Sequence, residues 1–359
     1  MGSEISSLQV THETVERPSR EKILVIGGGP AGLAAAIAAR SAGHPVTVVE
    51  RSLPPIDKAC GEGILPAGVS ALQQLGVATL PQYGFPIRGV RFISGSISVD
   101  APFPSGLGLG LRRTQLHELL VERAGQLGIR FEWGVLSETS DRTGFRWIIG
   151  ADGVGSRTGS EAGLDSVRRD SSRFGFRRHY RIIPWTDYVE VYWGAHNQVY
   201  VTPIGADEVG IAVLTRDPRI RLDRALVEFP LLMERLDGAA SITAERGGRT
   251  ISRRLRRVVQ GNTVLIGDAS GSVDAITGGG LTLAFRQAVA LRDCLCCGDV
   301  NRYGSIHPEM MRRAALGDRL LLLLDRFPRL RHAVVRTLAA QPTIFGRLLA
   351  ALDDSHEVA

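Results

Sequence analysis

Residues 22–51 read KILVIGGGPAGLAAAIAARSAGHPVTVVER, and this stretch decides the fold. The apolar, β-branched run at 23–26 is too short for a helix and is typical of a buried parallel strand. GGGPAG follows at once, an Ala-rich segment then predicts a helix to about residue 40, and residues 45–49 predict a second strand that Glu50 closes. Strand, glycine-rich turn, helix, strand and terminal acid in one unit are typical of an adenine dinucleotide site.

The residue types of this turn each have a physical role. Gly27 permits the tight turn, Gly29 lets the backbone approach a pyrophosphate, and Gly32 allows the helix to pack closely on the strand. The helix N-terminus at Pro30 and Ala31 offers free N–H groups and a positive dipole end to the phosphates. The terminal acid can accept hydrogen bonds from ribose hydroxyls. The alternative, a turn whose glycines serve packing alone, stays open, as does the choice between FAD and NAD.

Composition narrows the function classes. The chain has 359 residues, 44% hydrophobic and 22% charged, which is ordinary for a globular protein with two interlocked domains. Its net charge of +6 comes almost wholly from arginine, without a basic block interleaved with aromatics, so we expect no nucleic-acid partner. Four cysteines form no secretory framework, which predicts reduced thiols and a cytoplasmic location. No run reaches the length of a membrane span, and the cysteines at 294–297 lack histidine partners, so no metal site is predicted.

Further along the chain, the pattern changes from helices and parallel strands to period-two runs. Residues 90–94 and 96–100 predict a hairpin, residues 106–110 a Gly/Leu loop, and residues 174–214 an antiparallel sheet. Charged helical sequence is expected between this sheet and a buried strand at 263–266. From about residue 281 the chain is expected to be mostly helical.

The predicted fold is α/β: a Rossmann-like dinucleotide-binding domain, an inserted antiparallel β-sheet domain that covers the substrate, and a helical C-terminal tail. The expected bounds are a disordered lead-in at 1–20, a discontinuous binding domain at 21–85, 112–165 and 258–300, a sheet domain at 86–111 and 166–257, and C-terminal helices at 301–359.

Two later motifs complete a set with the first. Residues 150–153 read GADG, and residues 267–271 read GDASG, followed by three glycines at 278–280. With GGGPAG and Glu50-Arg51, this set resembles the FAD-dependent monooxygenases of the para-hydroxybenzoate hydroxylase type and their relatives, the geranylgeranyl reductases and flavin-dependent halogenases. The resemblance covers about residues 21–290 and implies one FAD per chain, held without a covalent bond.

The resemblance also implies roles for individual residues. It places Asp268 on the ribityl chain, Arg113 on the cofactor from across the domain, and Asp152 near the pyrophosphate. A helix that begins after the glycines at 278–280 would point its N-terminus at the flavin N1–C2=O edge, which is negative in reduced flavin. The expected cofactor-binding residues are Gly27, Gly29, Pro30, Ala31, Gly32, Glu50, Arg51, Lys58, Gly61, Arg113, Asp152, Gly153, Asp268, Gly278, Gly279, Gly280 and Leu281.

Three residues are candidates for catalysis. Residues 58–63 read KACGEG, which resembles a K-x-C-G-x-G segment that lies beside the flavin in the geranylgeranyl reductase-like branch. Cys60 could reach the substrate side of the ring, or it is a small packed residue of a loop. Glu62 is either a polar contact to the cofactor or a helix cap. His179 could act as a general base, with a solvent-facing strand position as the favoured alternative.

The leading expectation is an FAD-dependent monooxygenase of secondary metabolism that hydroxylates an aromatic or polyketide-like molecule through a flavin C4a-hydroperoxide. The alternatives are reduction of isoprenoid double bonds, which the Cys60 segment and an apolar tail favour, halogenation, or flavin binding without turnover. The W-x-W-x-x-P motif of the halogenases is absent. NAD(P)H is the expected electron donor, and the substrate is an apolar or aromatic small molecule. The chain is expected to be a monomer or homodimer. The basic, apolar segment at 320–336 allows contact with a membrane surface, although ordinary helix packing is favoured.

Overall fold

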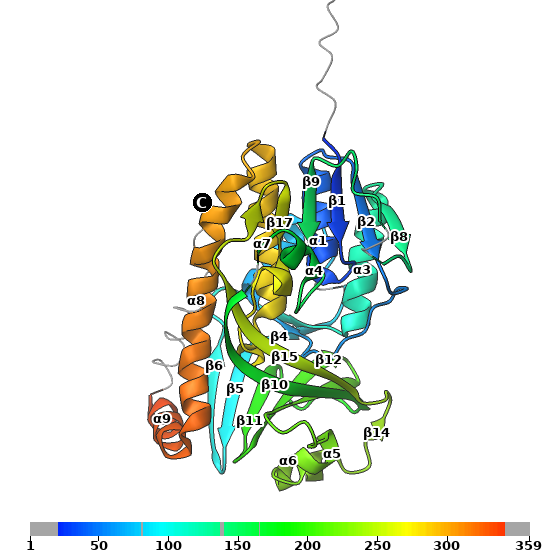
Figure 1. Ribbon diagram of the computed structural model, residues 1–359. Helices are drawn as coiled ribbons and strands as arrows, with labels where there is room; N and C mark the ends of the chain where they lie inside the picture. Colours follow the sequence, from blue (N-terminus) through cyan, green and yellow to red (C-terminus); the bar gives the residue numbers. More distant parts are fainter. Residues whose placement is uncertain (1–20, 80–81, 137–139, 165, 342–359) are drawn as a thin grey trace, which may run out of the picture.

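A computed structural model describes residues 21–79, 82–136, 140–164 and 166–341, with backbone alone for 166–171. Two large sheets lie one beyond the other, and a long helix runs along the side of both (Figure 1). This arrangement confirms the predicted α/β architecture with a parallel sheet and a separate, largely antiparallel one. The lead-in at 1–20 and the last residues, 342–359, lie outside the described residues.

The first sheet has six strands and is built from segments far apart in sequence. In spatial order they are β16 (Val259–Gln260), β17 (Thr263–Leu265), β9 (Trp147–Gly150), β1 (Ile23–Ile26), β2 (Val46–Glu50) and β8 (Arg130–Trp133). All neighbours pair in parallel except β16 and β17. Ile26 lies opposite both Val49 and Gly150, so the first and second motifs leave the sheet at the same edge.

Three helices pack with one face of this sheet in a single apolar core. They are α1 (Pro30–Ser41), α3 (Arg113–Gln126) and α7 (Gly280–Cys296). Ile23 and Val25 of β1 belong to this core, whereas Leu24 and Ile26 point to the opposite face and pack with Val49. The alternation follows from the strand period of two and explains why the whole run at 23–26 is apolar.

The second sheet has eight strands and contains the predicted period-two runs. Its strands are β14 (Ala240–Ser241), β10 (Ser166–Arg181), β13 (Glu208–Thr215), β12 (Asn197–Gly205), β11 (Tyr188–Trp193), β5 (Gly89–Ser94), β6 (Ile97–Pro102) and β15 (Arg246–Leu255). The predicted hairpin is β5–β6. Helices α5 (Leu222–Leu226) and α6 (Pro230–Leu236) pack against it with Val201 and Ile211.

The structure corrects two expectations about this region. The charged sequence between the antiparallel sheet and residue 263 was expected to be helical; α5 and α6 agree with this, but residues 246–255 form β15, which pairs with β10 from Ser166 to Arg177. Its arginines suit a strand because β10 is the one named strand among the described residues that pairs with β15, and no residue of β15 is fully buried.

The expected loop at 106–110 is the other correction, because Gly108–Gly110 form β7, the centre of a small sheet with β3 (Gly63–Ile64) and β4 (Phe85–Ile87). A Cβ on Gly110 would lie 1.8 Å from the Pro203 carbonyl oxygen, so only glycine lets β7 approach β12 this closely.

The tail is mostly helical, as expected, as far as Ala340. Helix α8 (Asn301–Arg326) runs along both sheets, and α9 (Pro328–Ala340) closes over β5 and β6 (Figure 1). Arg331 is buried, donates to the Gly194 carbonyl at 3.0 Å and stacks over Trp193, in keeping with the helix packing favoured for this segment. Within the described residues, no helix has the length and apolarity needed to cross a bilayer. The remaining helices are α2 (Pro66–Gln74) and α4 (Arg157–Glu161).

Candidate functional site

The glycines of the first motif differ in what surrounds them. Gly27 has φ 110°, and a Cβ there would lie 2.4 Å from the Ala151 carbonyl oxygen. A Cβ on Gly32 would lie 1.8 Å from the Gly27 carbonyl oxygen. Gly29 is different, because no atom lies within 4 Å of its Cβ position. The turn is thus closed around Gly27 and Gly32 and open at Gly29, where a pyrophosphate would approach the N-terminus of α1.

Glu50 is tied to the backbone of this turn. Its Oε2 accepts from the Gly28 N–H at 2.8 Å, and its Oε1 accepts from the Ser52 N–H at 2.8 Å. Each carboxylate oxygen keeps a further lone pair, so Glu50 can still accept from ribose hydroxyls. The next residue, Arg51, is exposed.

His117 of α3 fastens the same turn and was not among the predicted residues. It is fully buried, and its Nε2 lies 2.9 Å from the Gly28 carbonyl oxygen. Burial lowers the pKa of His117, so the neutral ring donates to that carbonyl. The signal available in the sequence was weak: a histidine four positions after Arg113 on an amphipathic helix.

The second motif has a structural role in this fold. Asp152 accepts from the Thr158 N–H and the Thr158 hydroxyl at 3.0 Å each, and the Ser156 hydroxyl donates to its other oxygen. The carboxylate therefore holds the start of α4. Gly153 has φ 79° and an open Cβ position, so it lets the chain turn past the dinucleotide loop.

The third motif lies directly against the first. Residues Gly267–Ser270 form the short helix η1, and a Cβ on Gly267 would lie 2.5 Å from the Ala31 Cβ. The side chain of Asp268 is half-exposed, and its Oδ2 lies 3.5 Å from Lys58 Nζ. Two predicted cofactor residues, Ala31 and Lys58, thereby lie beside η1, which carries a third, Asp268, more than 200 positions later in the sequence.

A buried polar network holds η1 from behind. The Gly267 N–H donates to Gln287 Oε1 at 2.7 Å, and Gln287 Nε2 donates to His307 Nε2 at 3.2 Å. His307 Nε2 also lies 2.9 Å from the Ser270 hydroxyl. Burial lowers the pKa of His307 to about 4, so the ring remains a neutral acceptor at physiological pH. Gln287 and His307 carry no motif and were missed.

The glycines at 278–280 precede α7 as expected. Asp274 caps the short helix η2 (Ala275–Thr277), and Gly278 follows it in the left-handed conformation with φ 65°. No atom lies within 4 Å of the Cβ positions of Gly278 or Gly280, so this approach to the N-terminus of α7 is open. The Tyr200 hydroxyl of β12 donates to the Ile276 carbonyl at 2.8 Å and fixes the loop to the second sheet.

Arg113 and Glu62 meet where the two sheets adjoin. The Arg113 N–H donates to Glu62 Oε1 at 2.9 Å. Arg113 Nε is buried and has no hydrogen-bond partner among the described residues. An orphaned buried guanidinium nitrogen, together with the open Cβ positions of Gly29, Gly278 and Gly280, fits a large polar cofactor such as FAD.

Glu62 and His179 form a buried pair. Each is 2% exposed, and His179 Nε2 lies 2.6 Å from Glu62 Oε2. The other ring nitrogen, Nδ1, lies 3.0 Å from the Thr243 hydroxyl. The favoured expectation that His179 faces solvent is therefore wrong: its side chain points from β10 to Glu62, in the segment that precedes β3. Glu62 has φ 59°, an uncommon backbone conformation for a residue that is not glycine.

Arg177 extends the pair to a cluster. It is 3% exposed, its Nη1 lies 3.0 Å from His179 Nε2, and it forms an ion pair with Asp57. Sequence reasoning missed Arg177 and Asp57. The period of two along β10 was the available signal, because it places Arg177 on the same face as His179.

Cys60 is the more accessible neighbour of this cluster. Its side chain is half-buried, and its Sγ accepts from the Glu62 N–H at 3.4 Å. The adjacent Gly61 is exposed with an open Cβ position, and its carbonyl accepts from the Thr202 hydroxyl of β12 at 2.8 Å. The segment at 58–63 therefore lies between the domain that contains the GGGPAG turn and the second sheet.

Comparisons with known proteins agree with this geometry. The FAD binding domain family matches residues 22–66. The menaquinone reductase of Mycolicibacterium smegmatis is 26% identical over 93% of this chain and 92% of that protein. The menaquinone reductase of Mycobacterium tuberculosis is 29% identical over 86% of this chain and 84% of its own length. Digeranylgeranylglycerophospholipid reductase 1 of Methanothermobacter thermautotrophicus is 24% identical over 83% of each chain.

Solved structures show the same fold at lower identity. A triple mutant of a flavin-dependent brominase superposes with a TM-score of 0.77 at 16% identity, covering 93% of this chain and 96% of that one. A flavoprotein from Cytophaga hutchinsonii gives a TM-score of 0.77 at 20% identity, covering 92% of both chains.

Proposed function

We propose that this FAD-dependent oxidoreductase, which is similar to geranylgeranyl reductases in sequence and to flavin-dependent halogenases in fold, reduces a carbon–carbon double bond of an isoprenoid chain. The relatives that match most of its length are named as reductases of menaquinone and of digeranylgeranylglycerophospholipid. Both names denote lipids with isoprenoid chains. The halogenase and hydroxylase structures are less than 25% identical and support the fold alone.

The observation that carries the proposal is the position of Cys60. Its half-buried thiol lies beside the buried Glu62–His179 pair and between the cofactor-binding elements and the covering sheet. An alkene needs a hydride at one carbon and a proton at the other. A thiol in this position can give the proton, whereas Glu62 and His179 are too buried to meet a substrate directly.

The proposed chemistry divides these tasks. The glycines of the three motifs would hold FAD, and FAD in its reduced form would be the source of the hydride, with a donor of the NAD(P)H class as the source of its electrons. Cys60 gives its Sγ proton to the second carbon, and the thiolate then takes a proton from water. Glu62 positions Cys60, because its own N–H donates to Sγ and its two carboxylate oxygens are held by the Arg113 N–H and His179.

The test is anaerobic turnover of polyprenyl quinones and polyprenyl phospholipids by the FAD-loaded enzyme. We expect Cys60→Ala to retain FAD and to lose activity by about 100-fold or more, the usual loss when a general acid is removed. Cys296→Ala, on the exposed end of α7, is the matched control and should leave activity unchanged. Turnover that survives in Cys60→Ala would remove the thiol from the reaction.

Hydroxylation of an aromatic substrate is the second candidate. The observation that favours it is the buried Glu62–His179 pair, which could take up a phenol proton relayed by water without touching a substrate bound beneath β10. Oxygen uptake with NAD(P)H and phenolic substrates, without anaerobic turnover of any polyprenyl compound, would replace the reductase proposal with this one. Halide-dependent products in the same assay would indicate a halogenase.

A further inference from the structure

Helix α8 and the start of α9 expose a row of large apolar side chains. Leu316 is 63% exposed, and the row continues with Leu320 at 42%, Leu323 at 44%, Phe327 at 47% and Leu330 at 40%. Steps of four and three residues place the α8 members on one side of the helix. The opposite side is already packed, since Leu324 and Val335 belong to the core of the second sheet. The exposed row is therefore not needed to hold the tail in place.

The charges around this row have one sign. Between residues 312 and 336 the exposed ionisable side chains are arginines, apart from His332. They are Arg312, Arg313, Arg319, Arg326, Arg329 and Arg336. The two acids of this segment do not offset them at the surface, because Asp318 is buried and Asp325 binds Arg173 and Arg216.

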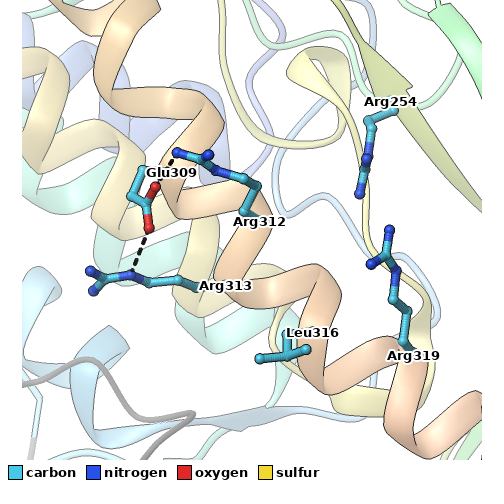
Figure 2. A pocket seen from close by; sticks show the side chains of 6 residues that line it. All are labelled: Arg254, Glu309, Arg312, Arg313, Leu316 and Arg319. Atoms are coloured by element: carbon cyan, nitrogen blue, oxygen red, sulfur yellow. Dashed lines mark hydrogen bonds and ion pairs between the residues drawn. The ribbon is translucent and has the colours of Figure 1, made fainter.

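A pocket of about 440 Å³ adjoins the row. Arg254 of β15 and five residues of α8 line it: Glu309, Arg312, Arg313, Leu316 and Arg319 (Figure 2). Glu309 pairs with Arg312 and Arg313. Figure 2 shows Arg254 and Arg319 extending toward one another from the two sides. Neither guanidinium has a hydrogen bond or ion pair with another described residue, so this pair of cations lacks an anion between them.

We propose that this α8 surface, the pocket together with the row from Leu316 to Leu330, docks the enzyme on an anionic lipid bilayer. A lipid phosphate would lie between Arg254 and Arg319, and the leucines would enter the interface beside it. Leu316 belongs to both the pocket and the row, so one bilayer can contact both at once. Apolar side chains flanked by arginines are the composition of interfacial helices that bind anionic membranes.

The charge pattern disfavours a second copy as the occupant. Two copies that met through this row would bring arginines against arginines. The proposal also goes beyond the proposed reaction and does not depend on it, because lipid binding is measured without turnover.

The experiment is vesicle flotation with the full-length, FAD-loaded protein. Vesicles contain phosphatidylcholine alone or mixed with phosphatidylglycerol, at low and high salt. We expect binding to the anionic vesicles alone, weakened by salt. Arg254→Glu/Arg319→Glu should weaken binding at least about tenfold, given the contribution of each arginine near a charged bilayer. Leu316→Ser/Leu320→Ser/Leu323→Ser should do so by about tenfold through lost apolar burial.

Matched controls come from the exposed surface of α5 and α6. Arg224→Glu and Leu231→Ser change an exposed arginine and a 68% exposed leucine there, and both should keep full binding. Retained flavin absorbance shows that each variant is folded.

Four results would overturn the proposal. In the first, the protein does not float with anionic vesicles. In the second, the control variants lose binding as much as the α8 variants do. In the third, the triple leucine variant turns a dimer into a monomer while vesicle binding stays unchanged. In the fourth, the arginine variant keeps vesicle binding but loses affinity for inorganic pyrophosphate, which would assign the pocket to a soluble phosphate.

Discussion

The turn from Gly27 to Gly32 and the Glu62–His179 pair differ in sequence separation: the turn consists of consecutive residues, whereas the pair joins residues far apart in the chain. The turn belongs to one strand–helix–strand unit, and its closest approach is local, because a Cβ on Gly32 would lie 1.8 Å from the Gly27 carbonyl oxygen. The pair joins residues 117 positions apart and exists only after the second sheet has packed on the first. A site can therefore combine a part that local backbone geometry defines with a part that only tertiary packing defines.

The sharpest test of the local part is Gly32→Ala. A Cβ 1.8 Å from the Gly27 carbonyl oxygen must displace backbone, so we expect the free energy of unfolding to fall by about 3 kcal/mol or more. Urea unfolding of the FAD-free protein measures it. Unchanged stability would mean that the turn is not closed as described.

Gly29 provides the matched control within the same turn. Gly29→Ala should leave the free energy of unfolding within about 0.5 kcal/mol, because its Cβ position is open. Gly29→Glu should also fold but should purify without yellow colour, since it puts a carboxylate where the pyrophosphate lies. Full flavin absorbance in Gly29→Glu would show that the phosphates bind elsewhere.

His179→Ala tests the non-local part. It leaves Glu62 buried without its closest partner, and we expect a loss of about 3 kcal/mol in the free energy of unfolding. Arg181→Ala on the same strand removes an ion pair whose side chains are 63% and 62% exposed, and it should cost at most about 1 kcal/mol. Equal losses would show that the buried pair is no more important than a surface one.

The variant Asp268→Ala tests whether FAD, the ligand expected at the Gly27–Gly32 turn, is also bound by a residue that tertiary packing brings to the site. A carboxylate that binds a ribityl hydroxyl contributes about 1.5–3 kcal/mol, so FAD should bind at least about tenfold more weakly. Flavin fluorescence titration measures the dissociation constant. Cys297→Ser, remote from the motifs at the end of α7, should bind FAD normally; equal affinities for the two variants would remove Asp268 from the site.

The smallest expected effect concerns the loop that leads into α7. Asp318 of α8 accepts from the Asp274 N–H, and burial raises its pKa from the ordinary 3.8 to about 7. The folded protein therefore keeps a proton that the unfolded chain loses, so the free energy of unfolding should fall by about 1 kcal/mol per pH unit between pH 5 and 7. Asp318→Asn keeps the acceptor and should remove this slope. An identical slope in both proteins would assign it to other groups.

Sequence predicted the local part of the site and the fold class, because glycine spacing and strand periodicity act over short distances. It could not foresee that Arg177 and Asp57 would join Glu62 and His179, since no motif marks residues that meet through packing alone. It also predicted helix for a charged stretch that includes residues 246–255. These residues form a strand because they pair with β10, and the charge content of a sequence does not reveal such pairing. Gln287 and His307 were missed for the same reason as Arg177.

The place of β17 within the first sheet has a consequence for how the chain is made. Residues 263–265 pair with β9, yet they leave the ribosome more than a hundred positions after it. Until then, the apolar edge formed by Ile148 and Ile149 has no neighbour on that side, even though the dinucleotide turn is already synthesised. An unpaired apolar edge invites association with other chains. The nascent protein therefore carries this unpaired edge throughout the synthesis of the second sheet, until residues 263–265 cover it.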